Sequence, residues 1–258
     1  MVLTASSAVV ELSVFNVLAY PVERWKWVDL VNSEPLIHQE PMKTFYLGKT
    51  PLSTTLQLDL SPSRIKKGGF KIAAFGTSTT SLFESLTQDI CVKQMYHVME
   101  KVTVSDSARN GGSLVMKCID IPHDSWKQFQ NLTMEVACIV WAQALLDDVY
   151  DFIAEEVGRL GQPPFQIPQF RFVESALAME VSPDAAAKQK AAIFLVEEVI
   201  AEDRQGPFKK YLNNVSPVPL MMAHKEDEDR ASFLAFTQHV QYWKTKKQAF
   251  VSDYQGKY

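Results

Sequence analysis

Ala-Phe-Val-Ser-Asp-Tyr-Gln-Gly, residues 249–256, is the segment of this 258-residue chain that best predicts its fold. An apolar run rich in strand-forming residues leads to an acid, Asp253, and then to an amide, Gln255. Gly256 follows, and a glycine lets the chain turn sharply. We therefore expect a final strand over residues 246–252 that displays a carboxylate at its end, where catalytic side chains are commonly held.

In an extended chain, Asp253 and Gln255 lie two residues apart and therefore face the same side. An acid beside an amide can position a hydroxyl nucleophile, or share a metal ion with the oxygens of a phosphate. The structural alternative is a turn at the strand end in which Asp253 caps local N–H groups. The pattern leaves both interpretations open.

The composition is that of an ordinary soluble protein, with 47% hydrophobic and 22% charged residues. The net charge of −4 gives no reason to expect nucleic acid or an anionic membrane as a partner. No run approaches the ~20 apolar residues of a membrane span. Three cysteines, Cys91, Cys118 and Cys138, lie inside apolar runs, so we expect buried thiols in a reducing, cytoplasmic compartment.

Hydrophobic periodicity predicts an α+β fold. Apolar residues at steps of three and four predict one long helix over residues 131–161 and a second over residues 231–242. Prolines interrupt residues 1–52 repeatedly, so we expect an irregular N-terminal extension with short strands there. Short runs typical of strands occur at residues 54–60, 70–75, 90–98, 114–119, 170–181 and 192–200. The first four of these runs predict an antiparallel sheet.

Two adjacent glycines, Gly68 and Gly69, lie between strand-like runs, and Lys71 follows them. Glycines let the backbone approach a ligand closely and aim its N–H groups at phosphate oxygens, and a lysine adds a positive charge. The segment is neither G-x-G-x-x-G nor a P-loop. An ordinary hairpin turn explains the same residues, so this signal alone is weak.

Lys93 stands between apolar neighbours in another strand-like run. The simpler interpretation is the solvated face of a strand, and the functional one is a lysine that contacts the α- and β-phosphates of a nucleotide. Such a lysine needs an acidic partner, for which Glu135 on the long helix is the candidate. Glu197 and Glu198 are adjacent in a later strand, so they point to opposite faces and at least one should meet the protein or a ligand.

His239 lies on the predicted second helix. A satisfied core histidine is the ordinary interpretation, and a zinc ligand is the functional one. The other four histidines have no ligand spacing with each other or with cysteine. No serine lies in a Gly-x-Ser-x-Gly segment, so the sequence does not predict a serine nucleophile.

Four segments follow one another along the chain: Lys67-Gly-Gly-Phe-Lys-Ile-Ala73, Val92-Lys93, Gly206-x-Phe-x-Lys-Tyr-x-Asn-Asn214 and Asp253-x-Gln-Gly256. In order and spacing, from about Leu56 to the terminus, they resemble the atypical alpha-kinase family, which phosphorylates serine and threonine in protein substrates. The last two segments are specific, and the first two are consistent with the family's glycine-containing loop and nucleotide-binding strand.

The resemblance implies a two-lobed, kinase-like α+β domain over residues 53–258, after an extension of residues 1–52. The smaller lobe, about residues 53–200, would be an antiparallel sheet with the one long helix. Residues 201–258 would form an incomplete second lobe. The domain would bind ATP and Mg²⁺ and act on a protein substrate.

The resemblance also implies roles for single residues. Asp253 and Gln255 would serve catalysis, with Asp253 holding Mg²⁺, and His239 would be the first of four zinc ligands. Lys93 would contact the ATP phosphates, and Glu197 with its hinge neighbours would hold adenine and ribose. The full set of residues that would bind ATP is Gly68, Gly69, Lys71, Lys93, Glu197 and Glu198.

In the family, a Thr-Asp-Pro element, the remaining His and Cys zinc ligands and a glycine-rich substrate loop follow Asp-x-Gln-Gly, and none follows here. We therefore expect a C-terminally truncated copy without a complete zinc site. One hypothesis is an active serine/threonine kinase. The alternative is a pseudokinase that binds nucleotide, or serves as a scaffold, without transferring phosphate.

Overall fold

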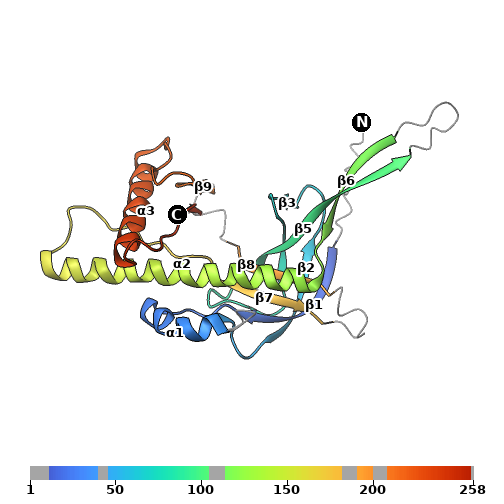
Figure 1. The fold of residues 1–258 in the computed structure, drawn as a ribbon, viewed down its shortest axis with the longest axis horizontal. Helices are drawn as coiled ribbons and strands as arrows, with labels where there is room; N and C mark the ends of the chain where they lie inside the picture. The colour runs from blue at the N-terminus through green and yellow to red at the C-terminus, as the bar shows by residue number, and fades with distance from the viewer. Residues whose placement is uncertain (1–11, 40–45, 105–113, 182–190, 200–207, 257–258) are drawn as a thin grey trace, which may run out of the picture. The chain divides into compact units, whose positions relative to one another are not determined.

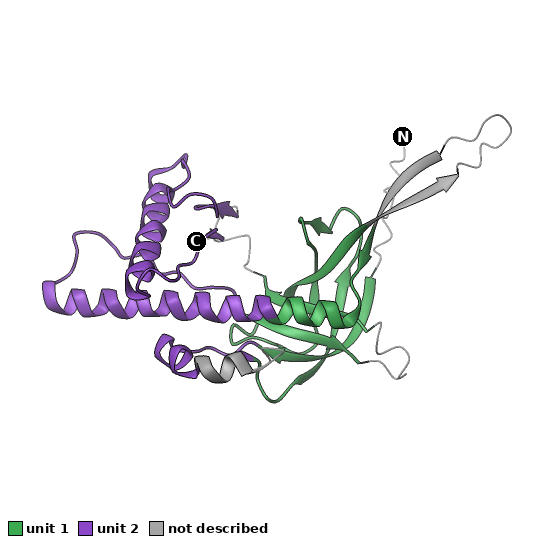
Figure 2. Ribbon diagram, viewed as in Figure 1, with its two compact units in different colours: residues 1–21, 47–133, 174–199 green, residues 22–46, 134–173, 200–258 purple. Residues whose placement is uncertain are grey.

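The computed structural model describes residues 12–39, 46–104, 114–181, 191–199 and 208–256. The chain divides into two compact units, which Figure 2 colours separately. Unit 1 contains residues 1–21, 47–133 and 174–199, and unit 2 contains residues 22–46, 134–173 and 200–258. Helix α2 (Ser125–Leu160) begins in unit 1 and continues in unit 2. Because antiparallel strands and helices occur together, the predicted α+β class is confirmed.

Unit 1 is built on an eight-stranded antiparallel sheet. Its strands are β1 (Leu12–Pro21), β2 (Leu52–Asp59), β3 (Lys66–Lys67), β4 (Lys71–Ser78), β5 (Asp89–Val104), β6 (Leu114–Pro122), β7 (Ser175–Glu180) and β8 (Ile193–Glu198). Six of them close into a ring in the order β4-β2-β1-β7-β8-β5, with β5 returning to β4. The second half of β5 leaves this barrel and pairs with β6 in a two-stranded ribbon (Figure 1).

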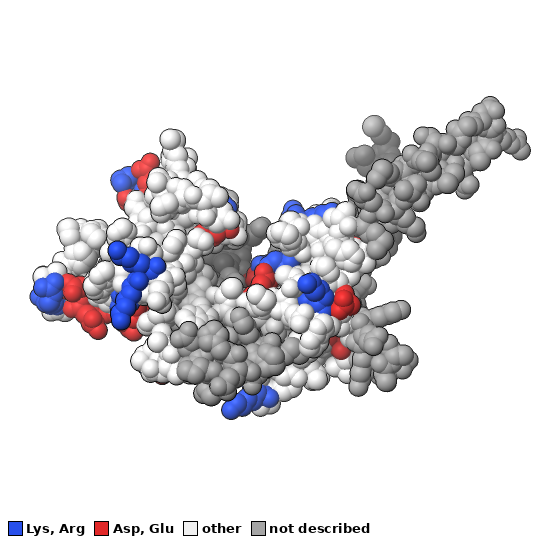
Figure 3. All heavy atoms as spheres, viewed as in Figure 1, with Lys and Arg blue, Asp and Glu red and all other residues white. Residues whose placement is uncertain are grey.

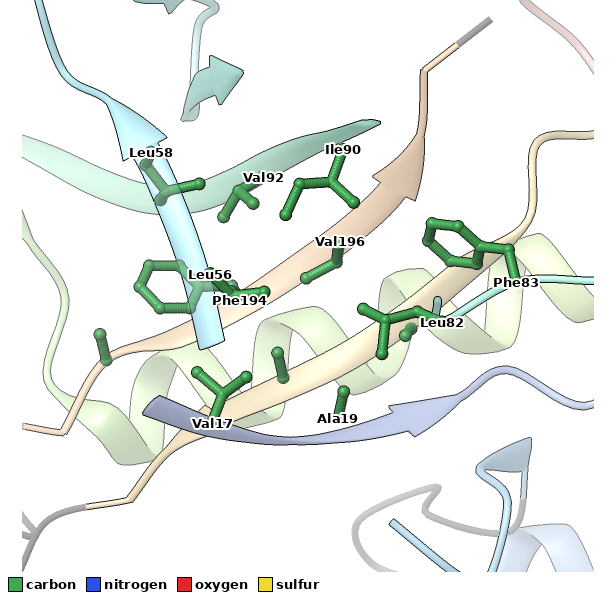
Figure 4. Close-up of a cluster of buried hydrophobic side chains, with 13 residues drawn as sticks. Val17, Ala19, Leu56, Leu58, Leu82, Phe83, Ile90, Val92, Phe194 and Val196 are labelled. Carbon is green, nitrogen blue, oxygen red and sulfur yellow. The ribbon is translucent and has the colours of Figure 1, made fainter. Parts of the chain in front are cut away.

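The barrel interior is filled by side chains that alternate along the strands (Figure 4). On β2, for example, Leu56 and Leu58 point inward and are buried, while Gln57 between them is exposed. Gly76 of β4 lies opposite Leu58, and a Cβ built on it would come within 2.0 Å of the Gln57 carbonyl oxygen. Only glycine fits this close approach between β2 and β4.

The described part of residues 1–52 belongs to these units and is not irregular. β1 lies between β2 and β7, and its Val17 and Ala19 are part of the barrel core. Helix α1 (Trp27–Gln39) follows in unit 2, where the ring of Trp27 meets that of Trp141 on α2 edge to face at 5.5 Å. The N-terminal segment therefore supplies a barrel strand and a packed helix, in place of the expected extension.

Unit 2 also contains α3 (Lys225–Lys244) and the two-residue strands β9 (Lys209–Lys210) and β10 (Gln255–Gly256). One cluster of buried side chains joins these elements: Tyr211, Leu212, Ala231, Leu234 and Tyr254. Phe170 and Phe172 pack against this cluster. The C-terminal residues are thus held against α3 by an apolar core of their own.

Both predicted helices are longer than hydrophobic periodicity indicates. α2 begins at Ser125 because Asp124 caps it, with its Oδ1 accepting the N–H of Lys127 at 2.9 Å. The helix ends before Gly161, which has a positive φ of 89°. α3 begins six residues before its predicted start, with acidic residues in its first turn, where the helix dipole favours negative charge.

Two further sequence expectations concern the surface. Cys91 is half-buried but Cys138 is exposed, so the prediction of a buried thiol is wrong for Cys138. Among the described residues, no helix has the length and apolar character that crossing a membrane requires. On the face shown in Figure 3, several basic side chains lie beside acidic ones.

Candidate active site

The glycine segment forms the turn between β3 and β4, as the hairpin interpretation predicts. Gly68 N–H donates to the Lys71 carbonyl at 2.8 Å, and Gly68 O accepts from the Tyr96 hydroxyl at 2.7 Å. Both backbone groups of Gly68 are therefore bonded inside unit 1. The Cβ position of Gly69 faces open space, so Gly69 is the glycine whose backbone a ligand can approach.

Lys93 forms an ion pair with Glu197. Its Nζ lies 2.7 Å from Oε1 and 2.6 Å from Oε2 of that carboxylate. The strand register explains the pair: Cys91 of β5 lies opposite Glu197 of β8, and Lys93 lies two residues further along the same face. The Lys93 side chain is 29% exposed and that of Glu197 is 14% exposed, so the pair is partly shielded from water.

This pairing corrects the prediction of an acidic partner for Lys93. The partner in the structure is Glu197 on β8, and not Glu135 on α2. The pair also changes the thiol beside it. Burial, and then the Glu197 charge, raise the pKa of Cys91 to about 11, although the Lys93 charge acts in the opposite direction.

Glu198 occupies the other face of β8, as strand alternation predicts. It is only 5% exposed, and its Oε1 accepts the backbone N–H of Glu174 at 2.8 Å. The Glu174 carboxylate in turn accepts the N–H groups of Glu84 and Ser85. Both acids therefore meet the protein: Glu197 binds Lys93, and Glu198 binds the backbone of Glu174, whose carboxylate holds residues 84–85.

The C-terminal segment is not the predicted strand. Lys246 and Lys247, directly after α3, have positive φ values of 53° and 70°, so residues 246–252 turn rather than extend. Asp253 itself has a φ of 62°, and only the next residues, Gln255–Gly256, pair with a neighbour, β9. The alternation that would place Asp253 and Gln255 on one side therefore does not apply.

The Asp253 carboxylate lies next to a lysine that sequence reasoning did not select. Lys210 Nζ forms an ion pair with Asp253 Oδ1 at 2.6 Å. The geometry of this contact is not that of a hydrogen bond, and among the described residues Asp253 Oδ1 accepts no hydrogen bond. Lys210 is the lysine of the Gly-x-Phe-x-Lys-Tyr segment, so a signal for it was present in the motif. The motif's first glycine, Gly206, lies outside the described residues.

The neighbouring lysine of β9 points the other way. Lys209 pairs with the buried carboxylate of Asp227 on α3, which also accepts from Arg230 Nη1 at 3.0 Å. The Lys209 hydrogen bond, and then that of Arg230, lower the pKa of Asp227 against the effect of burial. Lys209 thus anchors β9 to α3, and Lys210 is left to face Asp253.

The predicted metal ligands differ in how well they fit a metal. His239 is exposed on α3, so it is not a core histidine. In the described part of the chain, no group of three or more His, Cys, Asp or Glu is arranged to hold a metal ion, so a zinc site does not fit there. Asp253 has the type of ligand that Mg²⁺ takes in phosphate-transfer sites, where one or two carboxylates bind it beside the phosphates, but its Oδ1 is paired with Lys210 at 2.6 Å.

The sequence-predicted site residues fall into two groups. Unit 1 contains the glycine turn, Lys71, Lys93, Glu197 and Glu198, and unit 2 contains His239, Asp253 and Gln255. The structure brings Lys93 to Glu197 in unit 1, and Asp253 to Lys210 in unit 2. That Lys93 and Asp253 meet at one nucleotide remains a prediction.

Comparison with known proteins assigns the chain to a family. The profile of the Alpha-kinase family matches residues 89–258, about two thirds of the chain, so this chain belongs to the alpha-kinase family. The match includes Lys93, Glu197, Lys210 and Asp253. Membership supports a protein kinase function. Comparison with curated proteins gives no match.

Solved structures of alpha-kinase domains resemble the chain at low identity. The alpha-kinase domain of myosin heavy chain kinase A in complex with AMP is 12% identical, with a TM-score of 0.47, over 95% of this chain and 81% of that one. The same domain in complex with adenosine is 12% identical, with a TM-score of 0.46, over 98% of this chain and 79% of that one. At such scores, the family assignment rests on the profile match.

Proposed function

We propose that this chain is an ATP- and Mg²⁺-dependent protein kinase of the alpha type, which phosphorylates serine or threonine in a protein substrate. The observation that carries the proposal is the Lys93–Glu197 ion pair, which lies inside the segment that matches the family. A strand lysine held by a carboxylate is the arrangement by which kinases present a cation to nucleotide phosphates. Glu197 therefore takes the partner role that was expected for Glu135.

The partly buried pair has a clear chemical purpose in this proposal. An ammonium group on a flexible stem loses side-chain entropy when it binds a phosphate. Glu197 contacts Lys93 with both carboxylate oxygens and fixes the ammonium group in advance. ATP then binds a cation that is already oriented, and the Glu197 carboxylate continues to hold it from behind.

The catalytic group in this proposal is Asp253. Phosphoryl transfer requires mainly positioning and neutralisation of charge, so the protein must orient the attacking hydroxyl and take up its proton. The Asp253 carboxylate accepts the proton of the substrate serine or threonine. Asp253 and Gln255 are the residues that would hold Mg²⁺, which, when bound with ATP, neutralises charge on the phosphates.

The test measures ATP binding and phosphate transfer separately. Titration calorimetry with Mg·ATP should show that Lys93→Ala weakens binding by about tenfold or more, because a hydrogen bond to a charged group is lost. Lys49→Ala is the matched control, since Lys49 is an exposed lysine of the same unit. Transfer of labelled phosphate to a basic test protein should require the intact Lys93.

Each outcome decides between hypotheses. If Lys93→Ala binds Mg·ATP as tightly as the wild type, the assignment of this lysine is wrong. If the wild type binds Mg·ATP through Lys93 but transfers no phosphate, the chain is a nucleotide-binding pseudokinase. If it neither binds nor transfers, the kinase proposal is overturned.

A further inference from the structure

The residues on both sides of Asp253 are tied to helix α3, while Asp253 itself has a strained backbone. A φ of 62° is uncommon for a residue other than glycine and costs free energy, so it persists only where the surrounding structure imposes it. Two residues before it, Val251 is bonded through both its backbone groups to side chains of α3. One residue after it, Tyr254 is bonded to α3 through its hydroxyl.

Gln241 makes two of these bonds and connects the two sides. Its Oε1 accepts the N–H of Val251 at 2.8 Å, and its Nε2 donates to the Tyr254 hydroxyl at 3.1 Å. The residue is 1% exposed. A buried amide costs free energy unless it is bonded, and an apolar side chain would fill the same helix position without that cost. The Gln241 amide therefore holds the segment around Asp253 in place, and is not needed for the packing of α3.

Tyr254 fixes the segment from the other side. It is 7% exposed and belongs to the apolar cluster of unit 2, and its hydroxyl also lies 3.3 Å from Thr237 Oγ1. Its carbonyl accepts the N–H groups of Tyr211 and Leu212 at 2.9 and 3.2 Å. These bonds tie the segment directly to the residues that follow Lys210, the lysine that faces Asp253.

We infer that Gln241 and Tyr254 are positioning residues for the Asp253 carboxylate, which they hold in its strained conformation beside Lys210. The inference rests on the proposed function, because it assigns Asp253 the role of accepting the substrate proton. Neither residue touches the reacting atoms. They act by preventing the segment from relaxing to an ordinary backbone conformation, which would move the carboxylate.

The experiment compares three variants of the full chain in two measurements. Gln241→Leu removes both amide bonds, and Tyr254→Phe removes only the hydroxyl. Tyr150→Phe is the matched control, because its hydroxyl also bonds backbone groups within unit 2, at Pro168 O and Phe170 N. The measurements are steady-state phosphate transfer and amide hydrogen exchange, followed by NMR at Val251 and Tyr254.

Gln241→Leu should lower kcat by about ten- to a hundredfold, since a displacement of about 1 Å can cost that much. Its KM for ATP should rise by a smaller factor than its kcat falls, because the proposed phosphate contact of Lys93 lies in unit 1 and only the Mg²⁺ contact of Asp253 would be disturbed. Tyr254→Phe should lower kcat less, and Tyr150→Phe should change it by under about twofold. Exchange at the Val251 amide should accelerate by about fivefold or more in Gln241→Leu only.

A kcat for both Gln241→Leu and Tyr254→Phe within about twofold of the wild type would overturn the inference. So would an equal loss in Tyr150→Phe, which would reveal a general effect of loosening unit 2. If Gln241→Leu does not fold, the comparison of kcat between Tyr254→Phe and Tyr150→Phe decides the question. If the wild type transfers no phosphate, the proposed function fails. Independently of activity, an unchanged hydrogen-exchange rate at the Val251 amide in Gln241→Leu would show that Gln241 does not hold this segment, and would overturn the inference.

Discussion

Each unit holds one of the two lysine–carboxylate pairs of the candidate site, Lys93–Glu197 and Lys210–Asp253, and the units hold these pairs by different means. In unit 1, Lys93 and Glu197 lie on two paired strands, so the regular register of β5 and β8 sets their positions. In unit 2, Asp253 lies in an irregular segment with a positive φ, and side chains of α3 hold that segment through its neighbours. Both pairs have an oxygen–nitrogen distance of 2.6 Å.

The difference indicates that the two sites have different tasks: the Lys93–Glu197 pair is held rigidly by paired strands, and Asp253 is held by side-chain bonds to its neighbours. A strand ladder fixes a side chain with no special residues, which suits a group whose task is to bind a phosphate in one place. A tethered loop can give a carboxylate an orientation that regular structure does not allow, but it depends on several buried polar bonds. Damage to unit 2 should therefore act on turnover, and damage to the register of unit 1 on binding.

The largest expected effect tests the tethered carboxylate itself. Asp253→Asn keeps the shape and tolerates a positive φ, but it removes the charge. We expect kcat to fall by about a thousandfold, since proton acceptance contributes on that order. The melting temperature should change little, because the Lys210–Asp253 pair is about half exposed and such pairs contribute little stability.

Asp120→Asn is the control for that substitution. It removes the Lys67–Asp120 pair of unit 1, which has the same distance of 2.6 Å and similar exposure. Phosphate transfer and thermal unfolding are measured for both variants. An Asp253→Asn enzyme that keeps more than about a tenth of the wild-type kcat would contradict the catalytic role.

The next effect compares the two cores. Leu56 in the barrel and Leu212 in unit 2 are both 0% exposed, and truncation of a buried leucine to alanine costs about 2–5 kcal/mol. We expect the larger loss for Leu56→Ala, because its cluster is closed within a strand ring that relaxes little, whereas the smaller cluster of Leu212 can collapse. Urea unfolding measures both, and an equal or reversed order would contradict the comparison.

A smaller effect concerns the anchor of β9 in acid. The folded state holds the pKa of Asp227 below its ordinary value of 3.8, so the unfolded state binds its proton more readily. The stability that Asp227 contributes is therefore present above pH 3.8 and is lost as the pH falls through the lowered pKa of the folded state. Asp227→Asn should flatten this acid limb in thermal unfolding measured against pH.

Asp229→Asn on the same helix is the matched control. Asp229 pairs with Lys225, but its side chain is 61% exposed. The acid limb should therefore keep its slope in this variant, because an exposed pair changes little on folding. If both variants flatten the limb equally, the buried anchor is not its cause.

The sequence predicts the elements whose signal is local. Strands β2 and β4 and helix α2 appear because alternation and a helical stripe are properties of short segments. β1 is not placed, although short strands are expected in that region, because nearby prolines obscure an alternation whose inward residues are Val17 and the small Ala19. The prediction of a final strand is wrong because Lys246 and Lys247 adopt positive φ values, which the lysine side chain does not predict.

The site divides in the same way. Lys93, Glu197 and Asp253 could be selected from residue type and motif, but which residue each of them pairs with could not. The Lys93–Glu197 contact joins residues 104 apart and depends on strand register, which a single sequence does not specify. Gln241 carries no signal at all, because a glutamine on a helix is ordinary until its burial and its bonds to Val251 and Tyr254 are known.

The smallest expected effect comes from replacing the carboxylate residue of each pair by glycine. Asp253→Gly should change the free energy of unfolding by under about 0.5 kcal/mol, because glycine adopts a positive φ freely and this relief offsets the lost ion pair. Glu197→Gly should lower it by about 1–2 kcal/mol, because glycine weakens a strand interior and Lys93 loses its partner. Urea unfolding measures both. Equal losses would mean that Asp253 is not strained and that its neighbours do not impose its conformation.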